Sequence, residues 1–421
     1  MKFSTFYELQ TPKPWDDKSE LRSVHEALDQ VELADKLGFR YAWEVEHHFL
    51  EEYSHSSAPE VFLAAASQRT KNIRLGHGVV LMTPGYNQPA RVAERIATLD
   101  LVSNGRVDWG TGESSAEIEL GGFLIDPDRK RDMWRESTEQ CANMLAMTPY
   151  PGFEGEFFSM PCRNVVPKSV QKPHPPIWVA CSRRSTIRMA AEAGIGALVF
   201  GFIDPQEAKQ WVDEYYSIIK SDKCVPIGHS VNPNIAMIVG FSMNEDREKA
   251  IEQGQEGFEY FSYALGHYYL TGNHKPGNVN IWEQFQARRD AARLPVGLGI
   301  GTPEEVRDRM LKFQKSGVDQ VGFIQQAGNN RHEDICASLE LFSAKVMPDL
   351  VAGEDEREAS KMEELAPYIE QALGRKKWME PLAPDDVPGF PARSKDIIAA
   401  LQEVSGALVS AANDDKTGTG S

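Results

Sequence analysis

Short apolar segments alternate with amphipathic segments of helical period through most of the chain. In residues 20–37, for example, apolar side chains recur every three to four positions, as they do along a helix with one buried face. Strands are expected at residues 2–9, 40–44, 73–82, 107–110, 177–181, 197–201, 235–241 and 320–324. Helices are expected at residues 20–37, 58–68, 89–101, 130–147, 185–193, 205–220, 244–263, 303–315 and 334–346. This alternation is typical of a parallel sheet with helical crossovers.

The number of strand–helix units selects the architecture. Eight such units close naturally into a (β/α)8 barrel. A barrel of this kind takes roughly 250 residues, and over 400 with insertions, and this chain has 421 residues. We therefore predict an α/β fold, a TIM barrel with insertions and a C-terminal extension. An open doubly wound sheet is the alternative.

Three segments do not fit the repeat. Residues 149–176 are rich in Pro, Gly and Phe and are expected to form a hairpin before the fifth strand. Residues 267–301 follow an aromatic cluster, and a connection of this length is usually a lid or disordered. Residues 349–421 are charged, then proline-rich, with one short helix expected at 397–408. We assign residues 1–348 to the barrel and place the partly helical extension outside its core.

The composition limits which binding partners and which cellular compartment we expect for this chain. Lys and Arg total 45 against 62 Asp and Glu, a formal charge of -17, so the summed field repels nucleic acids and anionic lipids. The longest apolar runs fall far short of the roughly 20 residues that span a bilayer, and the N-terminus lacks a signal-peptide pattern. Five scattered cysteines indicate neither a disulfide framework nor a zinc cluster. We expect a cytoplasmic protein.

Polar residues at strand ends are the candidates for chemistry, because active sites of barrels lie there. Glu46, His47 and His48 follow the second expected strand, and imidazole titrates near neutral pH and can transfer protons. A metal site is an alternative, but neighbouring residues on a strand end point to opposite sides and the HExxH spacing is absent. Ordinary hydrogen-bonded loop histidines are a third interpretation. We favour a catalytic or ligand-facing histidine and assign no metal.

The segment after the fifth strand suits a phosphate group. Free N–H groups at a helix start, hydroxyls and arginines together can hold an anion. The candidate ligands are Ala180, Cys181, Ser182, Arg183, Ser185 and Thr186. An ordinary Ser/Thr helix cap with two solvated arginines explains the same residues. Cys181 has no evident activating partner and is expected to be a buried, unreactive thiol.

Two glycine-containing segments would let a planar ligand approach the backbone. Gly110-Thr111-Gly112 follows the fourth strand, although it does not complete the GxGxxG pattern of dinucleotide sites. Gly76 and Gly78 lie within the third strand, just before Val79. Glycines inside a strand usually mark a bulge or a close approach of backbone and ligand.

These residues resemble the bacterial luciferase-like family of flavin-dependent monooxygenases from residue 2 to about residue 350. Singly the shared motifs are weak, but six of them in register are specific. They are Glu46-His47-His48-Phe49, Asn87-Gln88-Pro89-Ala90-Arg91-Val92-Ala93-Glu94 with Ala97-Thr98-Leu99-Asp100, Ser103-Asn104-Gly105-Arg106, Val179-Ala180-Cys181-Ser182, Gly301-Thr302-Pro303-Glu304-Glu305, and Leu341-Phe342-Ser343 with Val346-Met347-Pro348.

The resemblance implies a barrel that binds reduced FMN supplied by a separate NAD(P)H:flavin reductase. The flavin would react with O2 and, as a flavin hydroperoxide, oxidise a small organic substrate. Aromatic residues in the lid suggest that this substrate is apolar or cyclic. The resemblance also implies a homodimer through helices 58–68 and 89–101, where alanines would permit close packing.

Positions carried over from the family give the expected site. His47 would be the catalytic histidine, with Glu46 beside it. Gly78–Val79 would be a non-proline cis peptide under the flavin ring. The other expected cofactor contacts are Thr111 and Gly112 beside the ring, and Ala180, Cys181, Ser182, Arg183, Ser185 and Thr186 around the phosphate.

Two positions depart from luciferase proper. Luciferase has a reactive cysteine where this chain has Gly112 and an arginine near the phosphate where this chain has Glu113. The first difference disfavours light emission and an aldehyde substrate. The second suggests that Arg183 or Arg184 supplies the missing positive charge. A deazaflavin-dependent oxidoreductase and a non-catalytic flavin-binding subunit are the alternatives, and the Glu46-His47-His48-Phe49 motif favours the monooxygenase.

Overall fold

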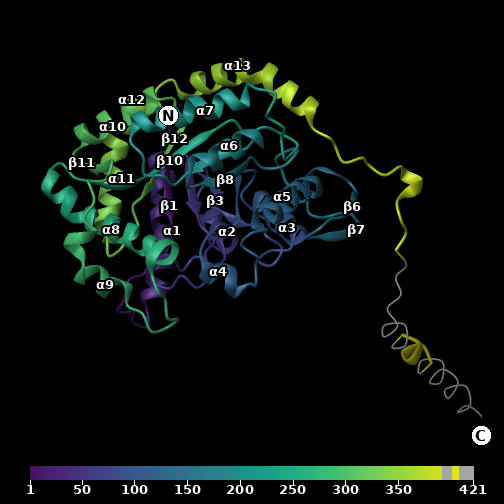
Figure 1. Cartoon of the computed structure of the whole chain (residues 1–421), viewed down its shortest axis with the longest axis horizontal. Coiled ribbons are helices and arrows are strands. Elements are labelled where there is room, and N and C mark those ends of the chain that lie inside the picture. The colour runs from purple at the N-terminus through teal and green to yellow at the C-terminus, as the bar shows by residue number, and fades with distance from the viewer. Residues whose placement is uncertain (391–400, 407–421) are drawn as a thin grey trace, which may run out of the picture. The chain divides into compact units, whose positions relative to one another are not determined.

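The computed structural model describes residues 1–390 and 401–406, and its centre is a closed parallel sheet (Figure 1). The strands of the ring are β1 (Lys2–Tyr7), β2 (Tyr41–Glu44), β3 (Arg74–His77), β5 (Val107–Gly112), β8 (Ile177–Cys181), β9 (Gly196–Val199), β10 (Ile235–Met243) and β12 (Gln320–Ile324). Pairing of β9 with β10, of β10 with β12 and of β12 with β1 closes the ring. The predicted TIM barrel is confirmed, and the open sheet is excluded.

Four further strands lie beside this ring. The antiparallel pair β6 (Tyr150–Glu154) and β7 (Ser159–Arg163) confirms the hairpin expected within residues 149–176. The third expected strand is interrupted, because β3 ends at His77 and β4 (Val80–Leu81) then pairs with β5. Short β11 (Gly299–Gly301) pairs with the end of β10.

Helices cover the outside of the barrel. All nine expected helices are present, with ends within three residues of the expected ones: α1 (Ser19–Leu37), α2 (Pro59–Arg69), α3 (Pro89–Val102), α5 (Lys130–Ala146), α6 (Arg184–Glu192), α7 (Pro205–Ile219), α8 (Arg247–Gly266), α10 (Pro303–Lys315) and α11 (His332–Lys345). Local signals fix their ends. Gly38 closes α1 in the left-handed conformation (φ 88°), and the Thr302 and Glu305 side chains form a capping box at α10.

Indole rings fill the inside of the barrel. Trp43 and Trp178 are fully buried there with ring centroids 5.3 Å apart. Gly76 and Gly196 leave room for them, because a Cβ at either position would lie within 2.4 Å of an indole carbon. The barrel is therefore a packed core and not a pore. Any ligand must bind at an end of the strands.

The segment 267–301, which we call the lid, is helical over much of its length. It contains a π-helix, η1 (His267–Thr271), followed by α9 (Ile281–Ala287) and the 3-10 helix η2 (Arg289–Ala292). Fully buried Glu52, from the loop after β2, accepts hydrogen bonds from the Ile281 and Trp282 N–H groups and from the Tyr260 hydroxyl. The lid is thus attached directly to the loop that carries His47.

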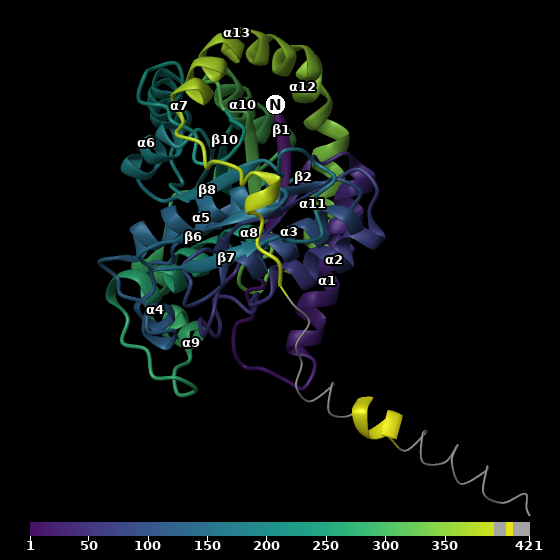
Figure 2. The same ribbon diagram turned by 90° about the vertical axis from the view of Figure 1, so that its right-hand side faces the viewer.

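The start of the C-terminal extension differs from the expectation. After α12 (Met347–Val351), helix α13 (Glu354–Arg375) lies at the end of the barrel where the strands begin (Figures 1 and 2). Lys2 of β1 binds Glu358 at 2.6 Å, and Lys361 binds Asp319, next to β12, at 2.8 Å. Leu365 of α13 joins the main hydrophobic core. Placing the whole extension outside the core was therefore wrong for α13.

Residues Met1–Pro381 form one compact unit and Leu382–Ser421 a second. In the second unit, η3 (Pro384–Asp386) is a single 3-10 turn. Of the helix expected at 397–408, residues 401–406 are helical and the others lie outside the described residues. No helix in the described part of the chain is long and apolar enough to cross a membrane.

The alanines expected at a dimer contact pack mostly within the chain itself. Ala66, Ala93 and Ala97 are fully buried in its own core, and Ala64 and Ala90 pack against that core. Since small residues that face the sheet allow helices to pack closely onto it, they give no evidence for a second subunit.

We predict that helix α13 contributes to the stability of the barrel. Leu365→Ala should lower the free energy of unfolding by about 2–5 kcal/mol, because the side chain is only 1% exposed. Met362→Ala on the same helix, where 37% of the residue is exposed, should change it much less. Chemical denaturation followed by circular dichroism measures both. A chain truncated after Leu350 that is as stable as one ending at Pro381 would contradict this prediction.

Candidate functional site

The candidate site lies where the barrel strands end. Glu8 directly follows β1, and His47 is the third residue after β2. These strands are parallel neighbours, with Tyr7 opposite Glu44, so the two side chains come from adjacent loops at the same end of the barrel. Glu119 joins them from the short helix α4 (Glu117–Gly122), which follows β5.

His47 lies between two buried carboxylates. Its Nδ1 is 3.0 Å from Glu119 Oε1, and its Nε2 is 3.6 Å from Glu8 Oε2. The Glu119 side chain is fully buried and that of Glu8 is 3% exposed, whereas 17% of the imidazole is exposed. We call these three residues the histidine centre. Its imidazole alone is open enough to meet a ligand.

Neighbouring groups hold both carboxylates in place. Glu119 accepts hydrogen bonds from the Ser114 hydroxyl at 2.6 Å and from the His48 N–H at 2.8 Å. Glu8 accepts a hydrogen bond from the Tyr53 hydroxyl at 3.1 Å. A histidine whose partners are fixed in this way keeps its ring orientation, which favours proton transfer in one defined direction.

Burial and neighbouring charges shift the pKa values of all three residues of the histidine centre. Burial lowers the pKa of His47, but the negative charges of Glu119 and Glu8 outweigh burial and raise it to about 9. Burial raises the pKa of Glu8 to about 7, partly offset by the charge of His47. The pKa of Glu119 is lowered, since His47 and three hydrogen bonds outweigh its burial. At neutral pH His47 is therefore a cation, and Glu8 lies close to its own titration point.

Glu46 and His48 have different surroundings from His47. Glu46 accepts hydrogen bonds from the Leu81 N–H at 2.7 Å and the Asn87 side chain at 2.9 Å. His48 Nε2 is 3.1 Å from Glu46 Oε1, and its ring stacks on Tyr86. Glu46 therefore ties the loop after β2 to β4 and the segment before α3. No group of His, Cys, Asp and Glu in the described part of the chain is arranged to hold a metal ion.

The turn between β8 and α6 has the expected donors on its surface. Ser182, Arg183 and Ser185 are exposed, and the free N–H groups at the start of α6 lie beside them. Thr186 is buried, and its hydroxyl donates to the Arg183 carbonyl at 2.6 Å, so it serves as a cap within the helix start. Cys181 is fully buried, and burial raises the pKa of its thiol to about 12, which makes it unreactive at neutral pH.

The basic residues near this turn differ from the expectation. Arg184 pairs with Glu214 on α7 and is therefore engaged away from the turn. Arg131 from α5 donates to Glu113 from Nε at 3.0 Å and from Nη2 at 2.9 Å. Lys130 Nζ lies 3.9 Å from the same carboxylate. Glu113 follows β5, the neighbour of β8 in the sheet. Lys130 and Arg131 are thus further cations close to the turn.

The backbone around Gly78 does not have the expected geometry. The cis peptide bonds among the described residues all precede prolines, and the bond between Gly78 and Val79 is trans. The Gly78 N–H donates to the Glu44 carbonyl at 2.7 Å, which continues the pairing of β3 with β2. The predicted cis peptide is therefore wrong. Gly112 is required sterically, because a Cβ there would lie 2.4 Å from Val79 Cγ2.

Thr111 and Ala180, which were also expected to contact the cofactor, are buried and half-buried. The Thr111 hydroxyl donates to the Trp178 carbonyl at 2.8 Å and accepts from the Trp134 indole, so its side chain belongs to the core. Ala180 is half-buried. Only the backbone of Thr111 is left to approach a cofactor.

Sequence reasoning missed Glu8, Tyr53 and Glu119. Glu8 was detectable, because it is the polar residue that follows the first strand. Glu119 was not, since it lies on a six-residue helix without a periodic pattern. Its distance of 72 residues from His47 gives no sequence signal either.

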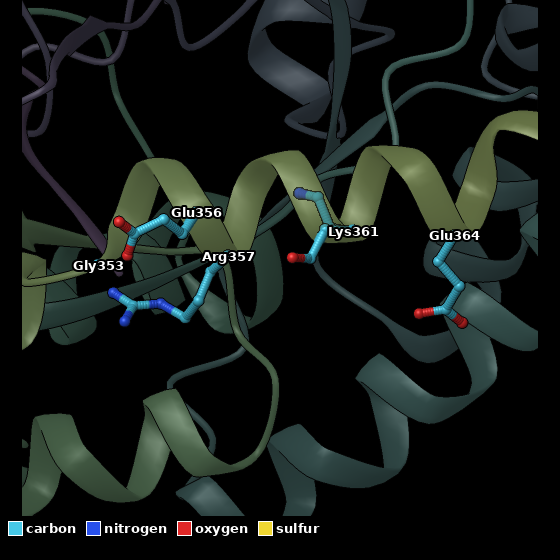
Figure 3. A pocket seen from close by; sticks show the side chains of 6 residues that line it. Gly353, Glu356, Arg357, Lys361 and Glu364 are labelled. Carbon is cyan, nitrogen blue, oxygen red and sulfur yellow. The ribbon is translucent and has the colours of Figure 1, made fainter.

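A pocket of about 550 Å³ lies elsewhere, on the surface of α13 (Figure 3). Its cations are already paired, Arg357 with Glu354 and Lys361 with Asp319. These residues lie at the opposite end of the barrel from the histidine centre, next to the start of the strands. We assign no function to this pocket.

Comparison with known proteins identifies the family of the chain. The family model described as luciferase-like monooxygenase matches residues 1–320. The oxygenase component of a flavin-dependent trigonelline monooxygenase from Acinetobacter baylyi is 25% identical over 360 residues, which cover 83% of this chain and 95% of that protein.

Solved structures agree with the architecture. The monooxygenase RslO1 from Streptomyces bottropensis has a TM-score of 0.68 and 28% identity, covering 83% of this chain and 99% of that one. An F420-dependent secondary alcohol dehydrogenase has a TM-score of 0.62 at 17% identity, covering 83% of this chain and 98% of that one. The second likeness is one of fold alone.

We predict that His47 titrates at about pH 9 in the folded protein, above its usual 6.5. Glu119→Gln should lower its pKa, because burial remains while the largest opposing charge is lost. Because the folded pKa is the higher one, protonation of His47 stabilises the fold fully below about pH 6.5, and this contribution is lost as pH rises through 9.

NMR titration of the histidine ring protons measures this pKa. Glu113→Gln is the matched control, because that carboxylate binds Arg131 and should leave the titration of His47 unchanged. A wild-type His47 that titrates near pH 6.5 would refute the prediction.

Proposed function

Because the chain belongs to the luciferase-like monooxygenase family, we propose that it is the oxygenase component of a two-component flavin-dependent monooxygenase. It uses reduced FMN, delivered by a separate NAD(P)H:flavin reductase, and O2 to oxidise a small organic substrate. The observation that carries this proposal is the histidine centre, in which His47 lies between Glu8 and Glu119 at the carboxyl ends of the strands. The named relative that is itself an oxygenase component supports the separate reductase.

The residues at this end of the barrel fit a flavin phosphate. Exposed Ser182 and Ser185 and the N–H groups of α6 supply hydrogen-bond donors. Arg183 is exposed beside them, and Lys130 and Arg131 add positive charge from α5. When bound, reduced FMN supplies the electrons with which O2 is activated.

The chain's own residues hold and move a proton. His47 is the catalytic group, since its imidazolium can donate a proton or a hydrogen bond at Nε2 while Nδ1–H is held by Glu119. Glu8 Oε2 lies 3.6 Å from His47 Nε2, too far for a hydrogen bond, and acts on the imidazolium through its charge. Glu119 is a positioning residue. Glu46 also acts by position, through its hydrogen bonds to Leu81 and Asn87.

A deazaflavin-dependent oxidoreductase is the second candidate. The likeness in fold to the F420-dependent dehydrogenase favours it, because the same barrel end would hold either cofactor. Absorption spectra and oxygen consumption with each reduced cofactor separate the two. Oxygen consumption with reduced FMN supports the monooxygenase, and substrate-linked reduction of deazaflavin alone supports the dehydrogenase.

His47→Ala should lower turnover with reduced FMN at least about tenfold, because positioned acid–base groups contribute typically 10²–10⁴-fold. His48→Ala is the control and should have a smaller effect, since His48 contacts Glu46 and Tyr86 and lies outside the histidine centre. Circular dichroism checks that both variants fold. Wild-type turnover in folded His47→Ala would remove this residue from the mechanism.

Ser182→Ala combined with Arg183→Ala should weaken the binding of FMN much more than that of riboflavin. Hydrogen bonds to a charged group contribute about 1.5–3 kcal/mol each, and riboflavin lacks the phosphate that would receive them. Quenching of flavin fluorescence measures both dissociation constants. Equal losses for the two ligands would place the phosphate elsewhere.

We also propose a cytoplasmic homodimer that uses α2 and α3. Free thiols at Cys141, Cys162, Cys181, Cys224 and Cys336 suit a reducing compartment. Val61 on α2 is 66% exposed, and Leu101 and Val102 at the end of α3 are 45% and 46% exposed. Light scattering at micromolar concentration should give twice the chain mass, and Val61→Asp should shift the protein towards the monomer. A monomeric wild type would contradict the dimer.

A further inference from the structure

Two buried imidazole rings face each other in the lid. His267 is the first residue of η1, and its Nε2 lies 3.3 Å from Nδ1 of His274. The His267 residue and the His274 side chain are each 8% exposed. Gly272 leaves room for the His267 ring, since a Cβ there would lie 2.6 Å from its Nδ1. The two rings are therefore in direct contact at a place that solvent hardly reaches.

His274 also attaches the lid to the loop after β2. Its Nε2 lies 3.0 Å from Glu51 Oε1, and the same oxygen accepts a hydrogen bond from the Gly277 N–H at 2.7 Å. The other oxygen of Glu51 binds Lys13 Nζ at 3.1 Å, and Lys13 Nζ donates to the Val279 carbonyl at 2.6 Å. These contacts hold the first half of the lid to the loops after β1 and β2.

This half of the lid, residues 267–280, lies against the histidine centre. Tyr268 of η1 packs on Tyr53 with ring centroids 6.4 Å apart, and Tyr53 in turn packs on His47 at 5.7 Å. The π-helix η1 also contacts α4, the helix that carries Glu119. Movement of residues 267–280 would therefore change the access of solvent and ligands to the imidazole of His47.

Only one proton fits between the two facing rings. Burial raises the pKa of Glu51, but hydrogen bonds from Gly277 and Lys13 outweigh burial and lower it, so Glu51 remains a carboxylate. His274 Nε2 must therefore carry the hydrogen of its contact with Glu51. His274 Nδ1 and His267 Nε2 then share a single N–H, which either ring can donate. If both rings were cations, two N–H groups of like charge would face each other and the hydrogen bond would be lost.

Groups from three segments surround the two rings. Glu51 and Glu52 lie in the loop after β2, and Lys13 in the loop after β1 pairs with Glu51. Tyr268 packs beside His267 at 5.1 Å and beside His274 at 5.0 Å. Burial raises the pKa of Tyr268, so its phenol is uncharged. The charge of Glu51 is shared between Lys13 and His274, so it balances a second imidazolium poorly.

Acid acts on the two rings through the second proton. Burial and the charge of His274 lower the pKa of His267 below its usual 6.5, although Glu52 opposes this shift. In an open lid His267 would be solvated and would bind a proton near that usual value. Because the closed lid binds this proton less readily, the contact stabilises closure fully above about pH 6.5 and less as the pH falls below that value.

We propose that His267 and His274 form a pH-sensitive latch, which holds residues 267–280 closed over the histidine centre near neutral pH and releases them in mild acid. The following part of the lid stays attached, because Glu52 accepts hydrogen bonds from the first two N–H groups of α9. Release of the latch opens this end of the barrel without unfolding the barrel. The inference concerns the lid itself and holds whichever cofactor the site binds.

Hydrogen–deuterium exchange of the full-length chain, measured by mass spectrometry at about pH 8 and about pH 5.5, tests the latch. Labelling times are scaled to the known pH dependence of intrinsic amide exchange. We expect residues 267–280 to exchange at least about tenfold faster at the lower pH on this scale. Residues 281–287 and strand β10 are the internal references and should change much less, because Glu52 and the sheet hold them.

Two variants assign the response to the latch. Glutamine can donate or accept a hydrogen bond but does not titrate, so His267→Gln and His274→Gln should each keep residues 267–280 closed at both pH values. His332→Gln is the matched control, because His332 lies 3.2 Å from Gln30, outside the lid, and its loss should leave the response of the wild type intact. Circular dichroism checks that each variant folds.

Equal scaled exchange of residues 267–280 at the two pH values would overturn the proposal. Faster exchange along the whole chain at the lower pH would do so as well, because the opening would then be global and not a release of the lid. If both His267→Gln and His274→Gln still open in acid, another group is the one that titrates, and the latch is refuted.

Discussion

Parallel closure of the sheet is the constraint on which the other features depend. Because every strand of the ring runs in the same direction, the loops that follow β1, β2, β5 and β8 meet at one end of the barrel. The fully buried indoles of Trp43 and Trp178 close the interior below them. Glu8, His47 and Glu119, which are far apart in the sequence, are therefore brought together at this end of the barrel.

Buried charge at this end is kept stable by pairing and hydrogen bonds. A lone buried carboxylate would be costly, but Glu119 has the imidazolium of His47 and two further donors. Glu8 has fewer partners, and its pKa is raised to about 7. The two carboxylates therefore differ in ionisation, since Glu119 stays charged and holds the imidazole ring whereas Glu8 titrates near neutral pH. The surroundings of each carboxylate thus separate the pKa values of two chemically identical groups.

Much of the fold could be predicted from the sequence, because the spacing of apolar residues and the capping residues are local signals. The helix that ends at Gly38 and the strand over Ile177–Cys181 are examples. Helix α13 was missed because its charged start and the internal Pro367 are typical of a segment outside the core, although Met362, Leu365 and Ile369 recur at helical spacing. The partners of His47 depend on tertiary contacts that no local pattern records. The expected geometry at Gly78–Val79 came from resemblance and not from physics, and the trans bond differs from it.

The pairing of β1 with β12 has a consequence for synthesis of the chain. Residues 2–6 form the first strand, but one of its two neighbours is residues 320–324. At about 5–20 residues per second on the ribosome, β1 must wait on the order of a quarter of a minute or more before that neighbour exists. Its unpaired edge is a template for wrong strand pairing during this time. Binding of chaperones to the nascent chain should therefore matter most before β12 has emerged.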